Sequence, residues 1–159
     1  MPELPEVETT KNAIAPVITG HTIVGTSITQ RSLRYPIEDT FEKNIQNAQI
    51  LSVERRSKYI YIHLNNSNSI IIHLGMTGNV LYSYEEPTRQ KHDHIMWQLN
   101  NCWLIYNDPR RFGLVLLIPT KDLPTHKLIK NLGIEPLTKK FTGAYLHAAL
   151  KNKKTPIKV

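Results

Sequence analysis

Apolar and polar residues alternate over much of the chain between residues 22 and 118, and this period of two predicts β-strands. The alternation is clearest at residues 59–64, where three aliphatic side chains alternate with two tyrosines and a histidine. Together with β-branched and continuous apolar segments, the alternating segments make eight short predicted strands with hairpin spacing, which is typical of an antiparallel sandwich or barrel-like sandwich. The predicted strands are 22–30, 49–55, 59–64, 69–74, 79–83, 92–99, 102–107 and 114–118.

Helical periodicity occurs at the two ends of the chain. In residues 5–18, Val7, Ile14 and Ile18 share one face by their spacing of three and four, and Gly20 provides a stop. A short helix is predicted over 123–132 and a last helix over 142–152. The expected fold is therefore mainly β with flanking helices: an eight-stranded antiparallel β-sandwich plus an N-terminal helix.

Composition narrows the class of protein. A chain of 159 residues is long enough for one domain with a real core. No apolar run approaches the roughly 18 residues that a membrane helix needs, and the N-terminus lacks the pattern of a signal peptide. The single cysteine, Cys102, excludes an internal disulfide and a cysteine-rich zinc site, so a cytoplasmic protein is the default expectation.

The positive charge is concentrated at the C-terminal end. The net charge is +7, yet residues 1–136 carry 14 Lys+Arg against 13 Asp+Glu, and residues 137–159 carry six lysines and no acidic residue. Such a tail can bind a polyanion. The alternative is a solvated chain end, which is the commoner case for a short lysine run.

The N-terminal segment MPELPEVETT offers covalent chemistry. Once Met1 is removed, Pro2 becomes a free secondary amine whose pKa lies near ~8, so a useful fraction is neutral at physiological pH. A neutral amine attacks electrophilic carbon, and a secondary amine gives an iminium that acts as an electron sink. The neighbouring Glu3 can move protons in the same step.

The same segment has a plain structural alternative. Pro5 suits the first turn of a helix, where its missing N–H needs no partner. Glu6 and Glu8 suit the positive end of the helix dipole. On composition alone, an ordinary helix start is the better interpretation.

Two segments collect cations or histidines. Residues 55–59 (RRSKY) place three cations beside an aromatic, which suits phosphate contacts and suits a solvated strand end about equally. In residues 91–94 (KHDH), His92 and His94 share a strand face and invite a metal interpretation. Two ligands and one acid are too few for that interpretation.

Two glycine-containing loops are candidates for contact with stacked bases. Residues 73–78 (HLGMTG) put Met76 on a turn, where the alternative is an exposed or half-buried filler. Residues 108–113 (DPRRFG) present two cations and Phe112, a suitable wedge for opening a base step, with Arg110 able to fill the gap left by an extruded base. The alternative is a structural turn with Phe112 in the core.

These segments, in this order, resemble the formamidopyrimidine-DNA glycosylase family, the repair enzymes that excise oxidised purines. The resemblance covers the chain almost end to end. It rests on PELPEVET, HLGM-x-G, KHDH and DPRRFG, and continues through LG-x-EPL at 132–137 and YLH at 145–147.

The resemblance implies roles for individual residues. Pro2 is the expected nucleophile and Glu3 the expected acid and base. Lys58 is expected near the phosphates of the damaged nucleotide, where it also assists elimination. The side chains expected to contact DNA are Met76, Arg110 and Phe112 as an intercalating triad, His92 at a phosphate, and Arg111 and Lys153.

The resemblance also implies a second domain with a helix-two-turns-helix unit and a four-cysteine zinc finger. Residues 1–136 are the expected catalytic sandwich domain, and 137–159 the linker and first helix of that second domain. The chain stops at Val159, so an N-terminal fragment is expected, with no cofactor of its own and zinc only in the full-length enzyme.

The expected function is that of a DNA glycosylase and abasic-site lyase acting on double-stranded DNA with oxidised purines or abasic sites. Activity is expected to be reduced or absent in a fragment, and impossible while Met1 is attached. A monomer is expected, with dimerisation through the exposed last helix as an option. The alternatives are a catalytically inactive DNA-binding fragment and a small-molecule enzyme of the tautomerase type.

Overall fold

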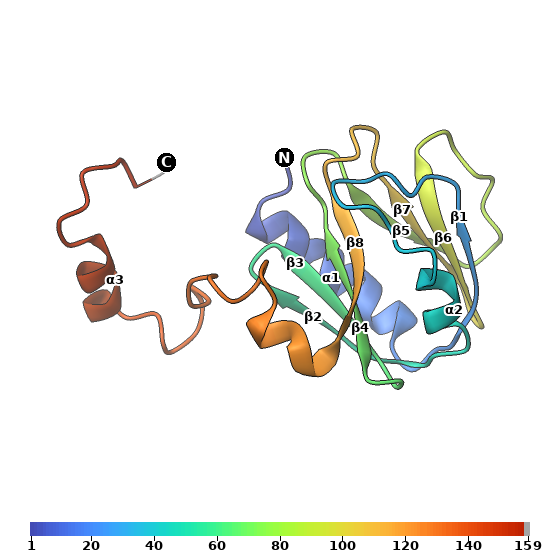
Figure 1. Cartoon of the computed structure of the whole chain (residues 1–159), viewed down its shortest axis with the longest axis horizontal. Helices are drawn as coiled ribbons and strands as arrows, with labels where there is room; N and C mark the ends of the chain where they lie inside the picture. The colour runs from blue at the N-terminus through green and yellow to red at the C-terminus, as the bar shows by residue number, and fades with distance from the viewer. Residues whose placement is uncertain (158–159) are drawn as a thin grey trace.

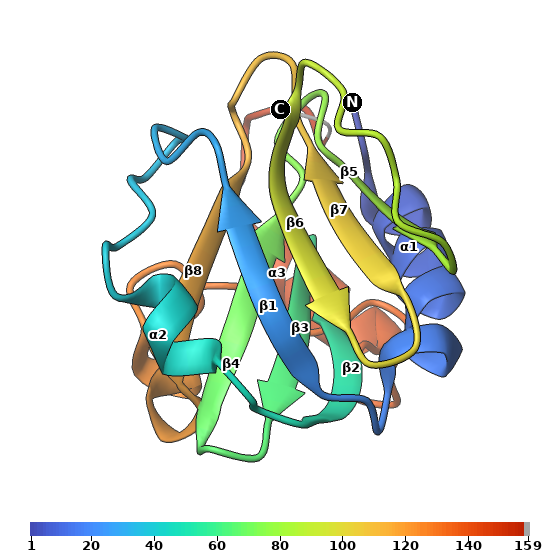
Figure 2. The same ribbon diagram turned by 90° about the vertical axis from the view of Figure 1, so that its right-hand side faces the viewer.

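Two four-stranded antiparallel sheets lie face to face in the computed structural model, which describes residues 1–157 (Figures 1 and 2). One sheet has the order β1-β6-β7-β5 and the other β2-β3-β4-β8. The predicted eight-stranded sandwich is confirmed. The strands are β1 (Ile23–Ile28), β2 (Ile50–Arg56), β3 (Tyr59–Leu64), β4 (Asn68–His73), β5 (Asn79–Ser83), β6 (Asp93–Leu99), β7 (Trp103–Asn107) and β8 (Leu114–Pro119).

Helix α1 (Leu4–Ile18) begins at a capping box. The Glu3 backbone N–H donates to the Glu6 carboxylate at 3.0 Å, and the Glu3 side chain caps the first turn in return. The predicted apolar face is confirmed, because Val7, Ile14 and Ile18 are all buried. The helix packs mainly against β2, so its first residue lies close to the end of that strand.

Strand β3 is buried on both faces, which alternation alone does not predict. In β3, Ile60 and Ile62 face the core between the sheets. Tyr59 and Tyr61 face outward, yet they are buried in a second cluster with residues of β8 and of the segment after it. The covering segment, residues 120–132, supplies Leu123 and Ile129 to that cluster.

The predicted helix over 123–132 is wrong. The chain forms the 3₁₀ helix η1 (Thr120–Thr125) and continues in turns. Leu123 and Ile129 of this segment pack into the cluster around Tyr59 and Tyr61, and these contacts hold the turns in place of a continuous α-helix. Helix α2 (Phe41–Ile45), which the periodicity did not predict, is a single turn anchored by buried Phe41 and Ile45.

The C-terminal helix α3 (Gly143–Leu150) lies apart from the sandwich, joined to it by residues 133–142 (Figure 1). None of its residues is buried. The predicted boundary at residue 136 stays a prediction. Lys158, one of the tail lysines, lies outside the described residues.

The connections between the two sheets determine where the candidate site forms. Residues 74–78 carry the chain from β4 in one sheet to β5 in the other, and residues 108–113 carry it back from β7 to β8. The two connections touch, since a Cβ added to Gly75 would meet the backbone of Phe112 at 2.5 Å. The structure thus brings together two loops that the sequence separates by about thirty residues.

Candidate active site

Glu3 and Lys58 form an ion pair, with Nζ of Lys58 2.6 Å from Oε2 of Glu3. Glu3 precedes the first turn of α1, and Lys58 lies in the two-residue turn between β2 and β3. Ser57 completes this turn with a φ of +53°. Both side chains of the pair are well exposed, at 49% for Glu3 and 36% for Lys58, so the pair is open to an incoming molecule.

Pro2 is half-buried beside this pair, and its nitrogen is in the amide bond to Met1. An amide nitrogen has no lone pair available for attack, so Pro2 chemistry requires removal of Met1. Met1 is 70% exposed, and its side chain lines a cavity with residues of the two inter-sheet loops.

Glu135 holds the turn that carries Lys58. Its carboxylate accepts hydrogen bonds from the Ser57 backbone N–H at 2.5 Å, from Arg55 at 2.8 Å and from Arg56 at 3.0 Å. Arg55 also pairs with Glu8 of α1. The turn is therefore fixed to the first helix on one side and to the start of the linker on the other.

These contacts set the pKa of Glu135. Burial acts to raise it, but the hydrogen bonds from Ser57, Arg55 and Arg56 outweigh burial and hold the pKa of Glu135 below its usual value. Glu135 is a functional residue that the sequence did not reveal. About 80 residues separate Glu135 from Arg55, Arg56 and Ser57, so no local pattern links them. The one indication in the sequence was the position of Glu135 within the LG-x-EPL motif.

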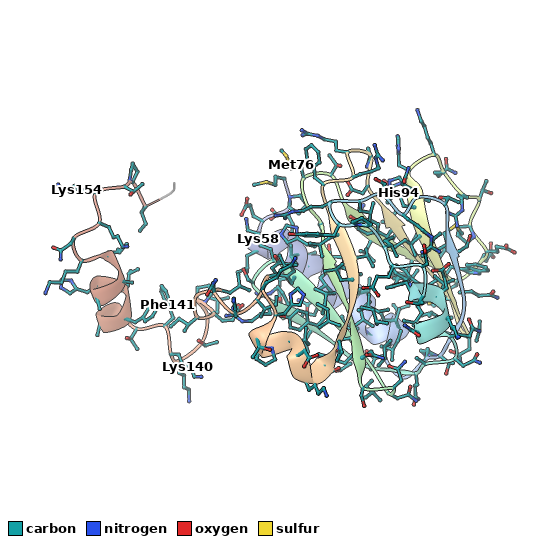
Figure 3. The ribbon with its side chains drawn as sticks, in the orientation of Figure 1. Lys58, Met76, His94, Lys140, Phe141 and Lys154 are labelled. Carbon is teal, nitrogen blue, oxygen red and sulfur yellow. The ribbon has the colours of Figure 1, made fainter. Side chains whose placement is uncertain are left out.

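Met76 and Phe112 project from the two inter-sheet loops and are 40% and 46% exposed. The Arg110 guanidinium lies over the Phe112 ring, 4.6 Å from its centroid. The alternative interpretation of Phe112 as a core residue is wrong, whereas Met76 as an exposed or half-buried filler stays an alternative. Figure 3 shows Met76 at the end of the sandwich where Figure 1 marks the N-terminus.

A cavity of about 380 Å³ lies between these loops and the N-terminus. It is largely apolar at Met76 and Phe112, and it carries two basic side chains that the sequence analysis did not assign, Arg34 and His73. The lining residues are Met1, Arg34, His73, Gly75, Met76 and Phe112.

His73 connects this cavity to the Lys58 turn. Its ring lies 4.9 Å from that of Tyr59, the residue after Lys58, and its Nδ1 accepts the Gly75 backbone N–H at 3.0 Å. Burial, together with the charges of Arg34 and Lys58, lowers the pKa of His73. A neutral His73 therefore keeps a proton on Nε2 and can donate it as a hydrogen bond.

The two histidines of the KHDH segment have different environments. His92 is partly exposed and lines a hollow of about 410 Å³ with Lys91, His94 and Arg111. His94 is buried, and its Nε2 lies 2.7 Å from the Asp108 carbonyl oxygen, to which it donates. His94 is therefore occupied by a structural hydrogen bond, whereas His92 is open to solvent.

The residues of this chain do not fit a metal site of the zinc-finger kind. Within residues 1–157, no group of three or more His, Cys, Asp or Glu side chains is placed to hold a metal ion. The single cysteine, Cys102, is buried, and burial raises the pKa of its thiol.

The predicted residues fall into three groups in space. Glu3 and Lys58 are paired, and Met76, Arg110 and Phe112 share the touching loops. Arg111 of the β7–β8 loop and His92, which precedes β6, line one hollow. Lys153 is exposed after α3, away from the sandwich, and Figure 3 shows the neighbouring Lys154 far from Lys58.

Within residues 1–157, no helix is both long and apolar enough to cross a lipid bilayer.

The sequence is similar to one family of known proteins. The family model described as the formamidopyrimidine-DNA glycosylase N-terminal domain matches residues 1–115. The formamidopyrimidine-DNA glycosylase of Bartonella henselae is 38% identical over 173 residues, which cover 99% of this chain and 59% of the relative. That of Hahella chejuensis is 43% identical, covering 99% and 58%. The chain thus spans less than two thirds of the length of these relatives.

The fold is similar to solved structures of the same family. The formamidopyrimidine-DNA glycosylase of Lactococcus lactis in complex with DNA containing an abasic site superposes with a TM-score of 0.89 at 30% identity, covering 99% of this chain and 59% of that one. The same enzyme in complex with DNA containing an oxidised pyrimidine gives a TM-score of 0.86, and the match covers 95% of this chain and 57% of that one.

Proposed function

This chain belongs to the formamidopyrimidine-DNA glycosylase N-terminal domain family, and from that premise we propose that it carries the catalytic half of a DNA glycosylase and abasic-site lyase. The proposed substrate is double-stranded DNA with an oxidised purine, such as 8-oxoguanine or a formamidopyrimidine, or with an abasic site. The observation that carries the proposal is the Glu3–Lys58 pair beside the half-buried Pro2. An acid, a cation and a potential amine nucleophile then lie together at the start of α1.

The proposed reaction begins after Met1 is removed. The neutral Pro2 nitrogen forms a bond to C1′ of the deoxyribose as the bond from C1′ to the base breaks, and the departing base takes up a proton. The Pro2 nitrogen then gives up its proton, the sugar ring opens as the bond from C1′ to O4′ breaks, O4′ takes up a proton, and an iminium forms between Pro2 and C1′. Glu3, at the N-terminus of α1, is the proposed group that exchanges these protons.

The iminium then drives strand cleavage. It withdraws electrons from C2′, so the C2′ proton is lost to a base and the 3′ phosphate leaves with its electron pair. Lys58 lies where it can hold that phosphate, since its ammonium is partly exposed and next to Glu3. Water later releases the product from Pro2.

Extrusion of the damaged base costs a few kcal/mol of stacking, and the two inter-sheet loops are the proposed means of offsetting that cost. Met76 and Phe112 are large, apolar and exposed, and Arg110 is stacked on Phe112. We propose that these three fill the space that the base leaves. His92 and Arg111 are proposed to hold a phosphate in their hollow, with Lys153 contributing charge from the tail.

The wider setting of the protein follows from the same premise. We propose that it acts as a monomer on DNA in a bacterial cytoplasm. The proposed second domain begins near residue 137, and any zinc finger lies outside these 159 residues.

A trapping experiment tests the proposed function. The chain with Met1 removed is incubated with abasic-site duplex and borohydride, which reduces an iminium to a stable amine. We expect a covalent protein–DNA adduct whose mass places the link at Pro2, and a weaker adduct for Pro2→Gly, whose amine is primary. The matched control is the chain with Met1 retained, in which no adduct at Pro2 and at most a weak adduct through the primary amine of Met1 are expected. An adduct of equal yield in the control would remove Pro2 from the mechanism.

A second candidate function is DNA binding without catalysis, which holds for any chain that retains Met1, because the Pro2 nitrogen is then an amide. Binding to lesion duplex without any trapped adduct after Met1 removal would support it.

A further inference from the structure

The Asp108 carboxylate is fully buried at the base of the β7–β8 loop and accepts three hydrogen bonds. Thr77 Oγ1 donates to Oδ1 at 2.7 Å, while the Tyr106 hydroxyl and the Gly113 backbone N–H each donate to Oδ2 at 2.9 Å. Burial raises the pKa of Tyr106, so its phenol retains the proton that it donates. A buried carboxylate that is satisfied in this way fixes the groups around it.

These donors come from both inter-sheet loops. Tyr106 and Gly113 flank the loop that presents Arg110 and Phe112, while Thr77 is next to Met76 on the other loop. Asp108 therefore holds its own loop closed and also captures the neighbouring one. The carbonyl oxygen of Asp108 accepts from His94 in addition, which fixes the backbone of Asp108 to β6.

The Thr77 hydroxyl is the central point of this link. It donates to Asp108 and accepts the Arg110 backbone N–H at 3.1 Å. One hydroxyl thus makes two hydrogen bonds across the gap between the loops. A hydrogen bond to a charged, buried partner is among the stronger ones in proteins.

Glycines allow the two backbones to come this close. A Cβ on Gly75 would lie 2.5 Å from the backbone of Phe112 and Gly113. A Cβ on Gly113 would lie 2.0 Å from the Tyr106 hydroxyl oxygen and 2.5 Å from the His73 carbonyl oxygen. The two loops are consequently in direct backbone contact as well as hydrogen-bonded, so neither can shift without the other.

We propose that Thr77 and Asp108 are positioning residues that join the loops of Met76 and of Arg110 and Phe112 into one rigid wedge. The proposal deepens the proposed function and rests on it. In a rigid wedge, Met76 and Phe112 enter the base stack together at a fixed separation. With the link removed, each loop must be ordered separately when DNA binds. The affinity for duplexes whose bases must be unstacked then falls more than the affinity for an abasic-site duplex.

The link is tested by asking whether Met76 and Phe112 act as a unit. The affinity of the 159-residue chain is measured for a duplex with 8-oxoguanine and for a duplex with an abasic-site analogue, which needs less unstacking. Met76→Ala, Phe112→Ala and the double variant are compared in the wild-type background and with Thr77→Val, which keeps the shape and removes the hydroxyl. Thr77→Ser retains the hydroxyl, and Thr88→Val changes an exposed threonine as the matched control.

In the wild-type background we expect the double variant to lose clearly less than the product of the two single losses, because the second change acts on a wedge already disabled. With Thr77→Val we expect the losses to multiply, and the affinity for the 8-oxoguanine duplex to fall about tenfold while that for the abasic duplex changes little. Thr77→Ser and Thr88→Val should behave as the wild type. A general loss of fold would weaken binding to both duplexes alike. It would not change whether the affinity losses of Met76→Ala and Phe112→Ala multiply in the double variant.

The outcomes separate this proposal from the proposed function. Retention of the coupling and of the duplex preference in a folded Thr77→Val variant would overturn the rigid wedge alone. A wild-type chain with no preference for 8-oxoguanine duplex over undamaged duplex would overturn both. If Thr77→Val is unfolded at the assay temperature, as its thermal melt would report, Thr77→Ala and Asp108→Asn replace it with the same expected and contradicting results.

Discussion

The ammonium of Lys58 lies 2.6 Å from the carboxylate of Glu3, although one residue belongs to the β2–β3 turn and the other to the start of α1. The pair is exposed, so it contributes little to folding. Its importance in the proposed mechanism is that it places a cation and a proton-transfer group side by side at the N-terminus.

Lys58→Met is expected to leave the free energy of unfolding within about 0.5 kcal/mol of the wild-type value, because exposed ion pairs are weak. Binding to every DNA substrate should weaken alike, since a phosphate contact carries no sequence information. The slope of log affinity against log salt should become shallower by about 0.9. A salt titration with three duplexes checks this, and a loss confined to lesion DNA would contradict it.

Phe112→Ala is expected to weaken binding to lesion or mismatched duplex about tenfold, since stacking on one aromatic contributes roughly 1–3 kcal/mol. Abasic and single-stranded DNA should be affected less, because less unstacking is needed. Leu81→Ala is the matched control, as Leu81 has a similar exposure of 47% on β5. Fluorescence titrations with the four DNAs provide the comparison, and equal losses for all of them would remove Phe112 from the wedge.

Stability should decrease in acid through Glu135. Its folded pKa is below the unfolded value, so its contribution is fully present above the unfolded pKa and is lost as pH falls through the folded pKa. Glu135→Gln should lower stability by about 2 kcal/mol near neutral pH, because Arg55 is left partly buried with one partner fewer. The difference from the wild type should shrink below about pH 4.

Urea unfolding of the wild type, Glu135→Gln and the exposed control Glu86→Gln from pH 3 to 7 measures this dependence. A difference in unfolding free energy between the wild type and Glu135→Gln that does not change with pH would show that Glu135 acts through packing rather than through charge.

Gly75→Ala is expected to destabilise the chain by at least about 2 kcal/mol, since φ is +60° and the new Cβ would overlap the backbone of Phe112. Gly20→Ala is the control for the dihedral alone. Gly20 has a φ of +85°, and a Cβ added there would meet nothing within 4 Å, so Gly20→Ala is expected to destabilise the chain by about 1 kcal/mol. Thermal melts of the two variants give the comparison, and equal losses would indicate that the loops can separate without cost.

Backbone amides of α3 are expected to exchange with solvent far faster than those of β3 and β4. None of its residues is buried, and an isolated helix of eight residues is marginal in water. Hydrogen exchange read by mass spectrometry on residues 143–150 tests this. Slow exchange that depends on protein concentration would instead indicate pairing between copies through the stripe formed by Tyr145, Leu146, Ala149 and Leu150.

The sequence alone determined the strands, the first helix and the residues worth examining. Alternation, β-branched and apolar runs and turn residues located all eight strands to within about two residues, because these are local properties of the sequence. The same local rules missed α2 and extended η1 into a helix. Helix α2 is held by the burial of Phe41 and Ile45, and residues 120–132 by packing over Tyr59 and Tyr61. Such contacts have no local signature.

Only the tertiary structure decided which candidate residues meet. Motif matches named Glu3, Lys58, Met76 and Phe112, yet no spacing in the sequence states that Glu3 pairs with Lys58 across 55 residues. The role of Glu135 likewise depends on the return of the chain to the β2–β3 turn. Two chain crossings between the sheets bring Thr77 to Asp108. Sheet order and crossing are products of long-range burial, and a one-dimensional pattern of residues contains neither.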